Sequence, residues 1–183
     1  MTIKNDMEFL VKAEMRKQRE LTGKNDDGCW CLLCEMDILA LALNQLPPRY
    51  CQEKNFCATD SRGFGGDVRN AVARAVQRVG RRPKHRPGRV PSGDTDVRME
   101  NYAQKIGHAV LATVLSSESA ACPCDQCQAD ILAYALNRYP PKYGVSYGGR
   151  ESYQENYADF IRHEIAQALT RAAAVVRERP HHL

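Results

Sequence analysis

Residues 29–50 read Cys29-Trp-Cys-Leu-Leu-Cys-Glu-Met-Asp-Ile-Leu-Ala-Leu-Ala-Leu-Asn-Gln-Leu-Pro-Pro-Arg-Tyr50, and residues 122–143 read Cys122-Pro-Cys-Asp-Gln-Cys-Gln-Ala-Asp-Ile-Leu-Ala-Tyr-Ala-Leu-Asn-Arg-Tyr-Pro-Pro-Lys-Tyr143. The matched residues lie 93 positions apart without a gap. Three cysteines, an Asp-Ile pair, an Ala-Leu-Asn and a Pro-Pro-basic-Tyr turn keep their places. Chance does not produce such agreement over 22 positions, so we predict a chain made of two copies of one small unit.

A second matching stretch locates the end of each unit. Residues 71–75 match residues 168–172 at an offset of 97, which places His85 opposite His182. The second copy has therefore gained four residues between Tyr143 and its last helix.

The N-terminal segments match only in pattern, with Phe9 and Tyr102 opposite each other at the offset of 93. We predict a first unit over residues 1–86, a basic linker containing proline and glycine over 87–94, and a second unit over 95–183.

Length and charge limit the classes of protein to consider. Each copy of about 85–90 residues is small for independent folding, so support from a metal or from the other copy is expected. The net charge of +4 is mild and does not by itself indicate nucleic acid. The basic residues nevertheless concentrate in the segment 78–98.

We expect an all-α, mainly helical fold in which the two units pack as a pseudo-dimer. Residues 37–46 are apolar nearly all round, which indicates a buried helix, and the following Pro47-Pro48 cannot continue it. A short strand is expected after each Pro-Pro-x-Tyr, most clearly over Tyr143–Tyr147. The expected helices cover residues 6–20, 37–46, 67–79, 97–115, 130–139, and a long last one that begins near a capping box at Ser152 and Glu155 and ends near Arg177.

The eight cysteines are better explained by metal than by disulfides. Residues 1–21 are charged and lack the apolar stretch of a secretory signal, and no apolar run approaches the ~20 residues that span a bilayer. We therefore expect a cytoplasmic chain without a membrane partner, in which thiols stay reduced and clustered cysteines bind metal.

The C-x-C-x-x-C pattern predicts one zinc site in each unit. Zinc prefers four nitrogen or sulfur ligands in a tetrahedron, and a helix that follows the cysteines directly favours thiolates. The six cysteine ligands are Cys29, Cys31, Cys34, Cys122, Cys124 and Cys127. The candidates for the fourth ligand are His85 in the first unit, with Cys51 and Cys57 as competitors, and His182 or His181 in the second.

Two catalytic interpretations of the cysteines are weak. Pro123-Cys124-Asp-Gln-Cys127 matches half of the zinc deaminase signature, but the H-x-E half is absent. A dithiol redox role lacks the βαβ pattern that accompanies it. Catalytic residues are therefore not predicted.

The repeated block resembles the late competence protein ComFB family, whose mark is C-x-C-x-x-C-x-x-D-[IV]-x-A-x-[AS]-L-N followed by a Pro-rich turn and Tyr. Both copies carry it, over Cys29–Tyr50 and Cys122–Tyr143. The resemblance implies small helical domains that form homodimers, here fused in tandem. It also implies a non-enzymatic bacterial regulatory protein that binds zinc through its cysteines, or a receptor for cyclic di-GMP, with a regulatory protein as a further partner. The length, the basic linker and the extra Cys51 and Cys57 depart from the usual pattern.

The remaining repeated residues have structural and ligand-binding interpretations. Asp37 and Asp130 are expected in the first turn of a helix or beside the metal, and Asn44 and Asn137 as C-terminal caps. A cation beside an aromatic ring can hold a phosphate and stack on a base, although the tyrosine can equally lock the turn. The candidate ligand-binding residues are Arg49, Tyr50, Arg74, Lys142, Tyr143 and Arg171.

Two functional classes follow from these observations. The first is a zinc-stabilised regulatory protein with cyclic di-GMP between its units, because a twofold symmetric ligand suits a pseudo-twofold pair. The second is a zinc-stabilised module associated with nucleic acid, which would contact phosphates through the basic segment 78–98.

Overall fold

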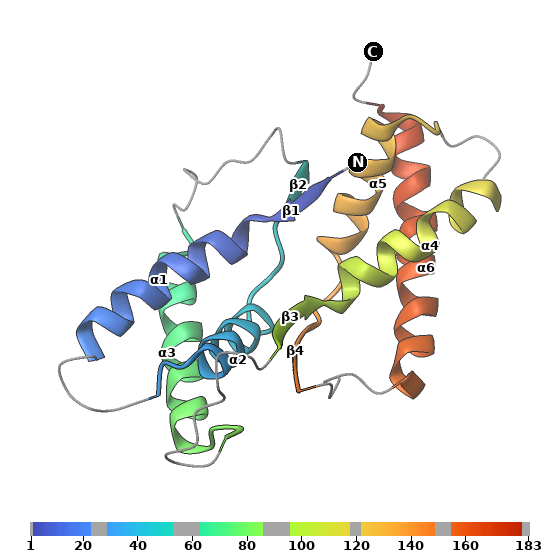
Figure 1. Cartoon of the computed structure of the whole chain (residues 1–183). Coiled ribbons are helices and arrows are strands. Elements are labelled where there is room, and N and C mark those ends of the chain that lie inside the picture. Colours follow the sequence, from blue (N-terminus) through green and yellow to red (C-terminus); the bar gives the residue numbers. More distant parts are fainter. Residues whose placement is uncertain are drawn as a thin grey trace.

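The computed structural model describes residues 2–22, 29–52, 63–85, 96–117, 122–148 and 155–180. Figure 1 shows the elements in these ranges. In chain order they are β1 (Ile3–Asn5), α1 (Asp6–Thr22), α2 (Leu32–Leu43), β2 (Tyr50–Gln52), α3 (Gly65–Arg81), β3 (Val97–Asn101), α4 (Tyr102–Ser117), α5 (Asp125–Leu136), β4 (Tyr143–Tyr147) and α6 (Glu155–Glu178). The predicted linker 87–94 and the capping residue Ser152 lie outside the described residues.

The prediction of a mainly helical fold is confirmed, and each expected helix is present. The buried helices α2 and α5 begin several residues earlier than expected, because Cys31 and Cys124 adopt extended conformations at their N-caps. Both helices end three residues before the expected ends, at Leu43 and Leu136. Asn44 and Asn137 are at the C-cap positions, as expected, and a Pro-Pro pair follows three residues further on. No helix in the described part of the chain is long and apolar enough to span a bilayer.

The short strands after each Pro-Pro-x-Tyr are also confirmed, since β2 begins at Tyr50 and β4 at Tyr143. The expectation of a helix from residue 97 is wrong. Residues 97–101 form β3, which pairs antiparallel with β4, and α4 starts only at Tyr102. The Asn101 side chain accepts a hydrogen bond from the Gln104 N–H at 3.2 Å, which favours the start of the helix there.

Strand register corrects the alignment of the N-terminal segments. Asn5 pairs with Tyr50, and Asn101 pairs with Tyr143. Because the tyrosines are 93 residues apart and the asparagines 96, the expected match of Phe9 with Tyr102 is wrong. The structural counterpart of Tyr102 is Asp6, the first residue of α1.

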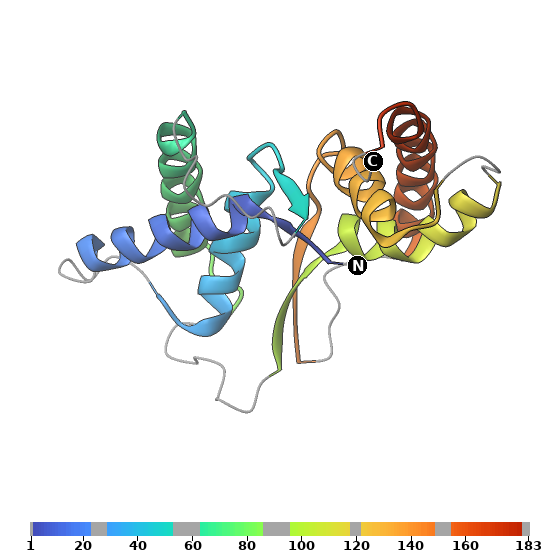
Figure 2. The ribbon, with the colours of Figure 1, turned by 90° about the horizontal axis from the view of Figure 1, so that it is seen from above.

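The helices form two bundles. In the first, α2 packs on α1 and α3, and in the second, α6 packs on α4 and α5. Figure 2 shows the two bundles side by side, with the strands between them and with α3 and α6 on the outer sides.

The strands are exchanged between the bundles. Strands β3 and β4 of the second unit pack on α2 of the first, while β1 and β2 of the first pack on α5 of the second. Tyr143 and Val145 are accordingly buried in the core of the first unit, and Ile3 and Tyr50 in the core of the second. The two predicted units therefore complete each other's cores.

Candidate metal centres

Four predicted ligands come together in the first unit. The Sγ atoms of Cys29, Cys31 and Cys34 and one ring nitrogen of His85 all lie within 4.8 Å of one another. The cysteines come from the N-terminus of α2, and the histidine from the segment that follows α3, so this group joins two helices of the bundle. The distance from Cys34 Sγ to His85 Nε2 is 3.2 Å.

The segment that carries His85 is held by its neighbour. Lys84 Nζ lies 2.6 Å from Oδ1 of Asp37, which is only 5% exposed. The hydroxyl of Tyr147, at the end of β4, donates a hydrogen bond to the Lys84 carbonyl at 3.5 Å. The buried helix and the exchanged strand thus both position the residue next to the histidine.

The second unit brings three ligands together. The Sγ atoms of Cys122, Cys124 and Cys127 lie within 4.8 Å of one another. The fourth ligands predicted here, His182 and His181, lie outside the described residues, as does Cys57 of the first unit. Cys51 is not part of the first cluster, and its thiol instead donates a hydrogen bond to Asp6 Oδ1 at 3.3 Å.

Backbone N–H groups at the helix starts lower the pKa of these thiols, and burial raises it. Partial burial opposes ionisation of Cys31, but the Cys34 N–H and the thiols of Cys29 and Cys34 lower its pKa. Burial and the neighbouring thiols raise the pKa of Cys34. In the second unit the Cys127 N–H lowers the pKa of Cys124, whereas burial and its neighbours raise the pKa of Cys127 to about 12.

These shifts mean that each cluster favours one thiolate over several. Full ionisation needs a compensating cation, and a bound divalent metal supplies it because it deprotonates coordinating thiols. A tetrahedral zinc ion with sulfur ligands at ~2.3 Å separates its ligand atoms by about 3.5–3.8 Å. The first cluster fits this geometry, because its ligand atoms already lie within 4.8 Å of each other.

The two repeated aspartates lie in the second turns of α2 and α5, because these helices begin earlier than expected. The predicted position in the first turn is therefore wrong. Asp37 pairs with Lys84, beside His85. Asp130 Oδ1 instead accepts a hydrogen bond from Gln52 Nε2 of the exchanged strand β2, at 2.6 Å.

The two repeated asparagines bind the other unit, a role that sequence reasoning missed. The Asn44 side chain accepts a hydrogen bond from the Tyr143 N–H and donates one to the Tyr143 carbonyl, both at 2.8 Å. The Asn137 side chain pairs in the same way with the backbone of Tyr50, at 2.5 and 2.9 Å. The only sequence signal for this role is the presence of Ala-Leu-Asn in both copies.

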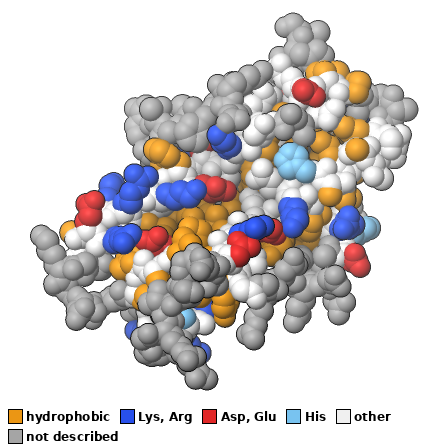
Figure 3. Space-filling view, viewed as in Figure 1, with side chains coloured by type: hydrophobic (Ala, Val, Ile, Leu, Met, Phe, Trp, Pro, Cys, Tyr) orange, Lys and Arg blue, Asp and Glu red, His pale blue; other side chains and the backbone are white. Residues whose placement is uncertain are grey.

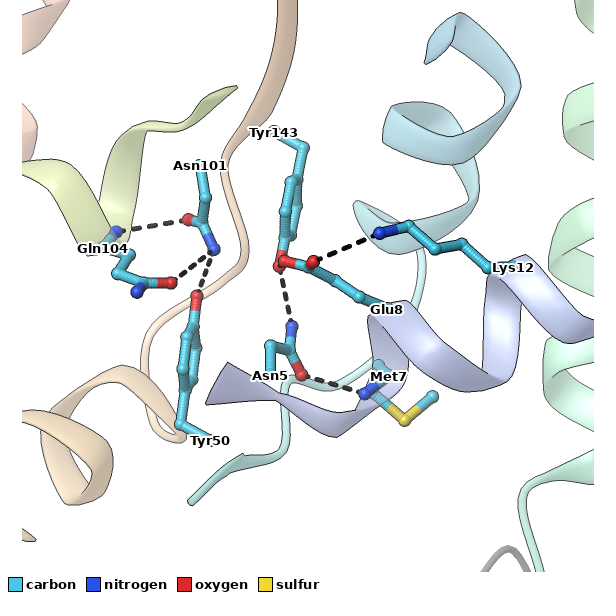
Figure 4. A network of polar contacts seen from close by, with 8 residues as sticks. All are labelled: Asn5, Met7, Glu8, Lys12, Tyr50, Asn101, Gln104 and Tyr143. Atoms are coloured by element: carbon cyan, nitrogen blue, oxygen red, sulfur yellow. Dashed lines mark hydrogen bonds and ion pairs between the residues drawn. The ribbon is translucent and has the colours of Figure 1, made fainter. Parts of the chain in front are cut away.

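The two tyrosines meet in a polar network between the units (Figure 4). Their residues are only 5% and 6% exposed. The hydroxyl oxygen of Tyr50 accepts a hydrogen bond from Asn101 Nδ2 at 2.6 Å, and that of Tyr143 accepts one from Asn5 Nδ2 at 2.9 Å. The Tyr143 hydroxyl also donates to Glu8 Oε1 at 2.8 Å. Burial raises the pKa of Tyr50 to about 12 and raises that of Tyr143 as well.

The candidate ligand-binding residues do not all converge on this network. The guanidinium of Arg49 lies over the ring of Phe64, 4.9 Å from its centroid. Arg74 on α3 donates from Nε to Gln45 Oε1 at 2.8 Å. Arg171 is exposed on α6, the outer helix of the other bundle. Lys142 directly precedes Tyr143, and its carbonyl accepts the N–H of Tyr102 at 2.8 Å.

Comparison with known proteins identifies the repeat. The family model described as late competence development protein ComFB matches residues 4–83 and again residues 99–180. No curated protein matches the chain, and no solved structure does. The two matches cover most of the chain and agree with the two exchanged units of the structure. The chain therefore belongs to the ComFB family, of which it carries two tandem copies.

Proposed function

We propose that this chain is a non-enzymatic regulatory protein whose two units are each stabilised by one zinc ion. The observation that carries the proposal is the convergence of three thiols and an imidazole within 4.8 Å in the first unit. This donor set is one that zinc uses in structural sites. The ComFB family is not known as an enzyme family, which agrees with a regulatory role.

A structural role suits the site better than a catalytic one. Four protein ligands fill the tetrahedron, whereas a catalytic zinc keeps one position open for water or substrate. The site also joins the N-terminus of α2 to the segment after α3, so a bound ion would hold the bundle closed. For the second unit we propose Cys122, Cys124 and Cys127 with His182, or His181, as the fourth ligand.

Elemental analysis of the full chain, purified without chelator, tests this proposal. We expect one zinc ion per cluster. Replacing Cys34 with serine should remove one of the two ions and lower the melting temperature, because metal binding and folding are coupled in such sites. Cys51→Ser is the matched control, since this thiol lies outside the cluster, and it should leave the zinc content unchanged. Negligible metal in the wild-type chain would refute the proposal.

The regulatory ligand that we propose is a cyclic dinucleotide bound at the contact between the units. Matched residues of both units meet there, which suits a ligand with two phosphates and two bases. Because the tyrosine rings are buried, such a ligand would rely on the cations beside them, Arg49 and Lys142. Calorimetry with cyclic di-GMP tests this, with Arg49→Ala expected to weaken binding by about one to two decades. Absence of saturable heat in the wild type would exclude the ligand.

A further inference from the structure

A cavity of about 380 Å³ lies between the first unit and the exchanged strand of the second. Its walls come from α2, from the end of α3 with the segment after it, and from β4. Leu41, Val79 and Val145 form an apolar part of the wall, and Arg78, Arg82 and Lys84 supply cations. This volume is within the range of pockets that bind small molecules.

The positive charge of this cavity is only partly compensated. Lys84 is neutralised by its ion pair with Asp37. Arg78 and Arg82 are solvent-exposed residues that line the cavity, and neither side chain has a hydrogen bond or an ion pair to the described residues. Two cations four residues apart at a helix end repel each other, so an anion between them would relieve an unfavourable arrangement.

The second unit has a neutral residue at one of the two positions, since Arg179 is the counterpart of Arg82 at the offset of 97. Val175 of α6 is the counterpart of Arg78 at the offset of 97, and it is 38% exposed. Tyr134 stands where the first unit has Leu41, and Arg138 covers its ring at 3.5 Å from the centroid. The fold can therefore be built with a neutral residue at the position of Arg78.

Stabilisation of the helix end does not explain the arginines either. Basic residues in a last turn favour the helix dipole, but the last turn of α6 has one of them, Arg177, next to Glu178, and Arg179 follows the helix. The last turn of α3 has both Arg78 and Arg81, and Arg82 follows as its C-cap. The first unit thus carries more positive charge here than its helix requires.

We infer that this cavity binds a small organic phosphate ester, whose phosphate lies between Arg78 and Arg82. Planar guanidinium groups match the oxygens of a phosphate in paired hydrogen bonds. The apolar wall of Leu41, Val79 and Val145 takes the organic part. The site lies beside Tyr143, but its cations come from the end of α3, and the second unit has Val175 and Arg179 at the matching positions. The inference does not depend on the proposed dinucleotide.

Titration of the full chain with phenyl phosphate and with inorganic phosphate, followed by calorimetry and NMR, tests the inference. Phenyl phosphate should bind saturably and more tightly than inorganic phosphate, with shifts at the Gly144 amide, which lines the cavity. Arg78→Val should weaken binding about tenfold or more. Valine is the residue of the other unit at this position, so the helix tolerates it.

Arg69→Ala is the matched control, because it removes the same charge from the same helix outside the cavity. Its affinity for phenyl phosphate should stay within a factor of about two. Equal losses in both variants would show a general charge effect and overturn the site. The site would also be overturned by the absence of saturation in the wild type or by equal affinity for inorganic phosphate. Displacement of phenyl phosphate by duplex DNA, to the same extent in the wild type and in Arg69→Ala, would overturn it as well.

Discussion

Asn44 and Asn137 each have two structural roles, as a helix cap and as a contact between the units. Each is the C-cap of a buried helix, and each uses its amide group to satisfy the N–H and carbonyl of a tyrosine from the other unit. A carboxamide can do this because it carries a donor and an acceptor side by side. The cap and the contact between the units are therefore coupled in a single residue.

Asn44→Ala should lower the free energy of unfolding by about 2–3 kcal/mol, because two backbone groups of Tyr143 lose their partner. Denaturant unfolding of the full chain measures the change. Gln45→Ala is the control, since Gln45 is exposed and its amide bonds residues of its own unit, the Leu41 carbonyl and Arg74 Nε. It should change stability by less than about 0.5 kcal/mol, and a similar loss in both variants would contradict the role of Asn44.

The tyrosine network predicts an alkaline limit of stability. The pKa of Tyr50 is raised to about 12, above its usual value of 10, because burial disfavours the phenolate. Because this pKa is raised in the folded state, the stabilisation that the neutral Tyr50 hydroxyl contributes is complete below pH 10 and is lost as the pH rises toward 12. Melting temperatures between pH 8 and pH 12 should fall more steeply in the wild type than in the double variant Tyr50→Phe/Tyr143→Phe. Parallel curves would contradict the prediction.

At the scale of elements, the short strands carry the contact between the units. Strand β1 escaped sequence prediction because its three residues are too few to show a pattern. Strand β3 alternates apolar and polar side chains over Val97–Glu100, but it runs directly into α4 and was therefore predicted as the start of that helix. Their partners β2 and β4 could be predicted from the residues after the prolines. Helices α2 and α5 were evident because they are apolar nearly all round, although their starts depended on the N-caps at Cys31 and Cys124.

Val145→Asp should destabilise α2, which belongs to the other unit. Val145 is 3% exposed in the core of the first unit, and burying a carboxylate there should cost about 3 kcal/mol or more. Hydrogen exchange should accelerate in α2 more than in α5. Ser146→Asp, at the adjacent and partly exposed position of the same strand, is the control and should leave both helices protected. Faster exchange confined to α5 would refute the strand exchange.

Some residues of the candidate metal site could be predicted by comparing the two copies, and others could not. His85 could be predicted because it recurs at the offset of 97 as His182, after the last helix of each unit. The pairing of Lys84 with Asp37 could not, since the matching Asp130 is bonded by Gln52 instead. Comparison of the two copies thus identifies candidate ligands that recur, but it does not identify interactions that belong to one unit.

At the scale of the whole molecule, the chain is an internal pseudo-dimer rather than two independent domains. Figure 3 shows basic side chains interspersed with carboxylates along α1 on one face, so this face is not uniformly positive.

The sequence predicted the pairing of the units but not the exchange of strands between them. The repeated sequence is compatible with strands that pack on the helices of the same copy, and equally with strands that pack on the helices of the other copy.

A fragment of residues 1–88 should therefore dimerise or unfold. Alone, it lacks Tyr143 and Val145 for its core and exposes Ile3 and Tyr50. Two copies can restore both contacts by exchanging strands, so its melting temperature should rise with concentration, whereas that of the full chain should not. Sedimentation equilibrium identifies the species, and a stable monomeric fragment would contradict the exchange.

The exchange of strands also sets the order of events during synthesis. The first bundle needs Tyr143 and Val145 to close its core, and these residues follow the end of α3 by more than sixty positions. At about 5–20 residues per second, the ribosome takes roughly 3–13 seconds to make that stretch. The nascent first half must wait with an incomplete apolar surface for that time, so it offers chaperones a binding site that the finished protein no longer has.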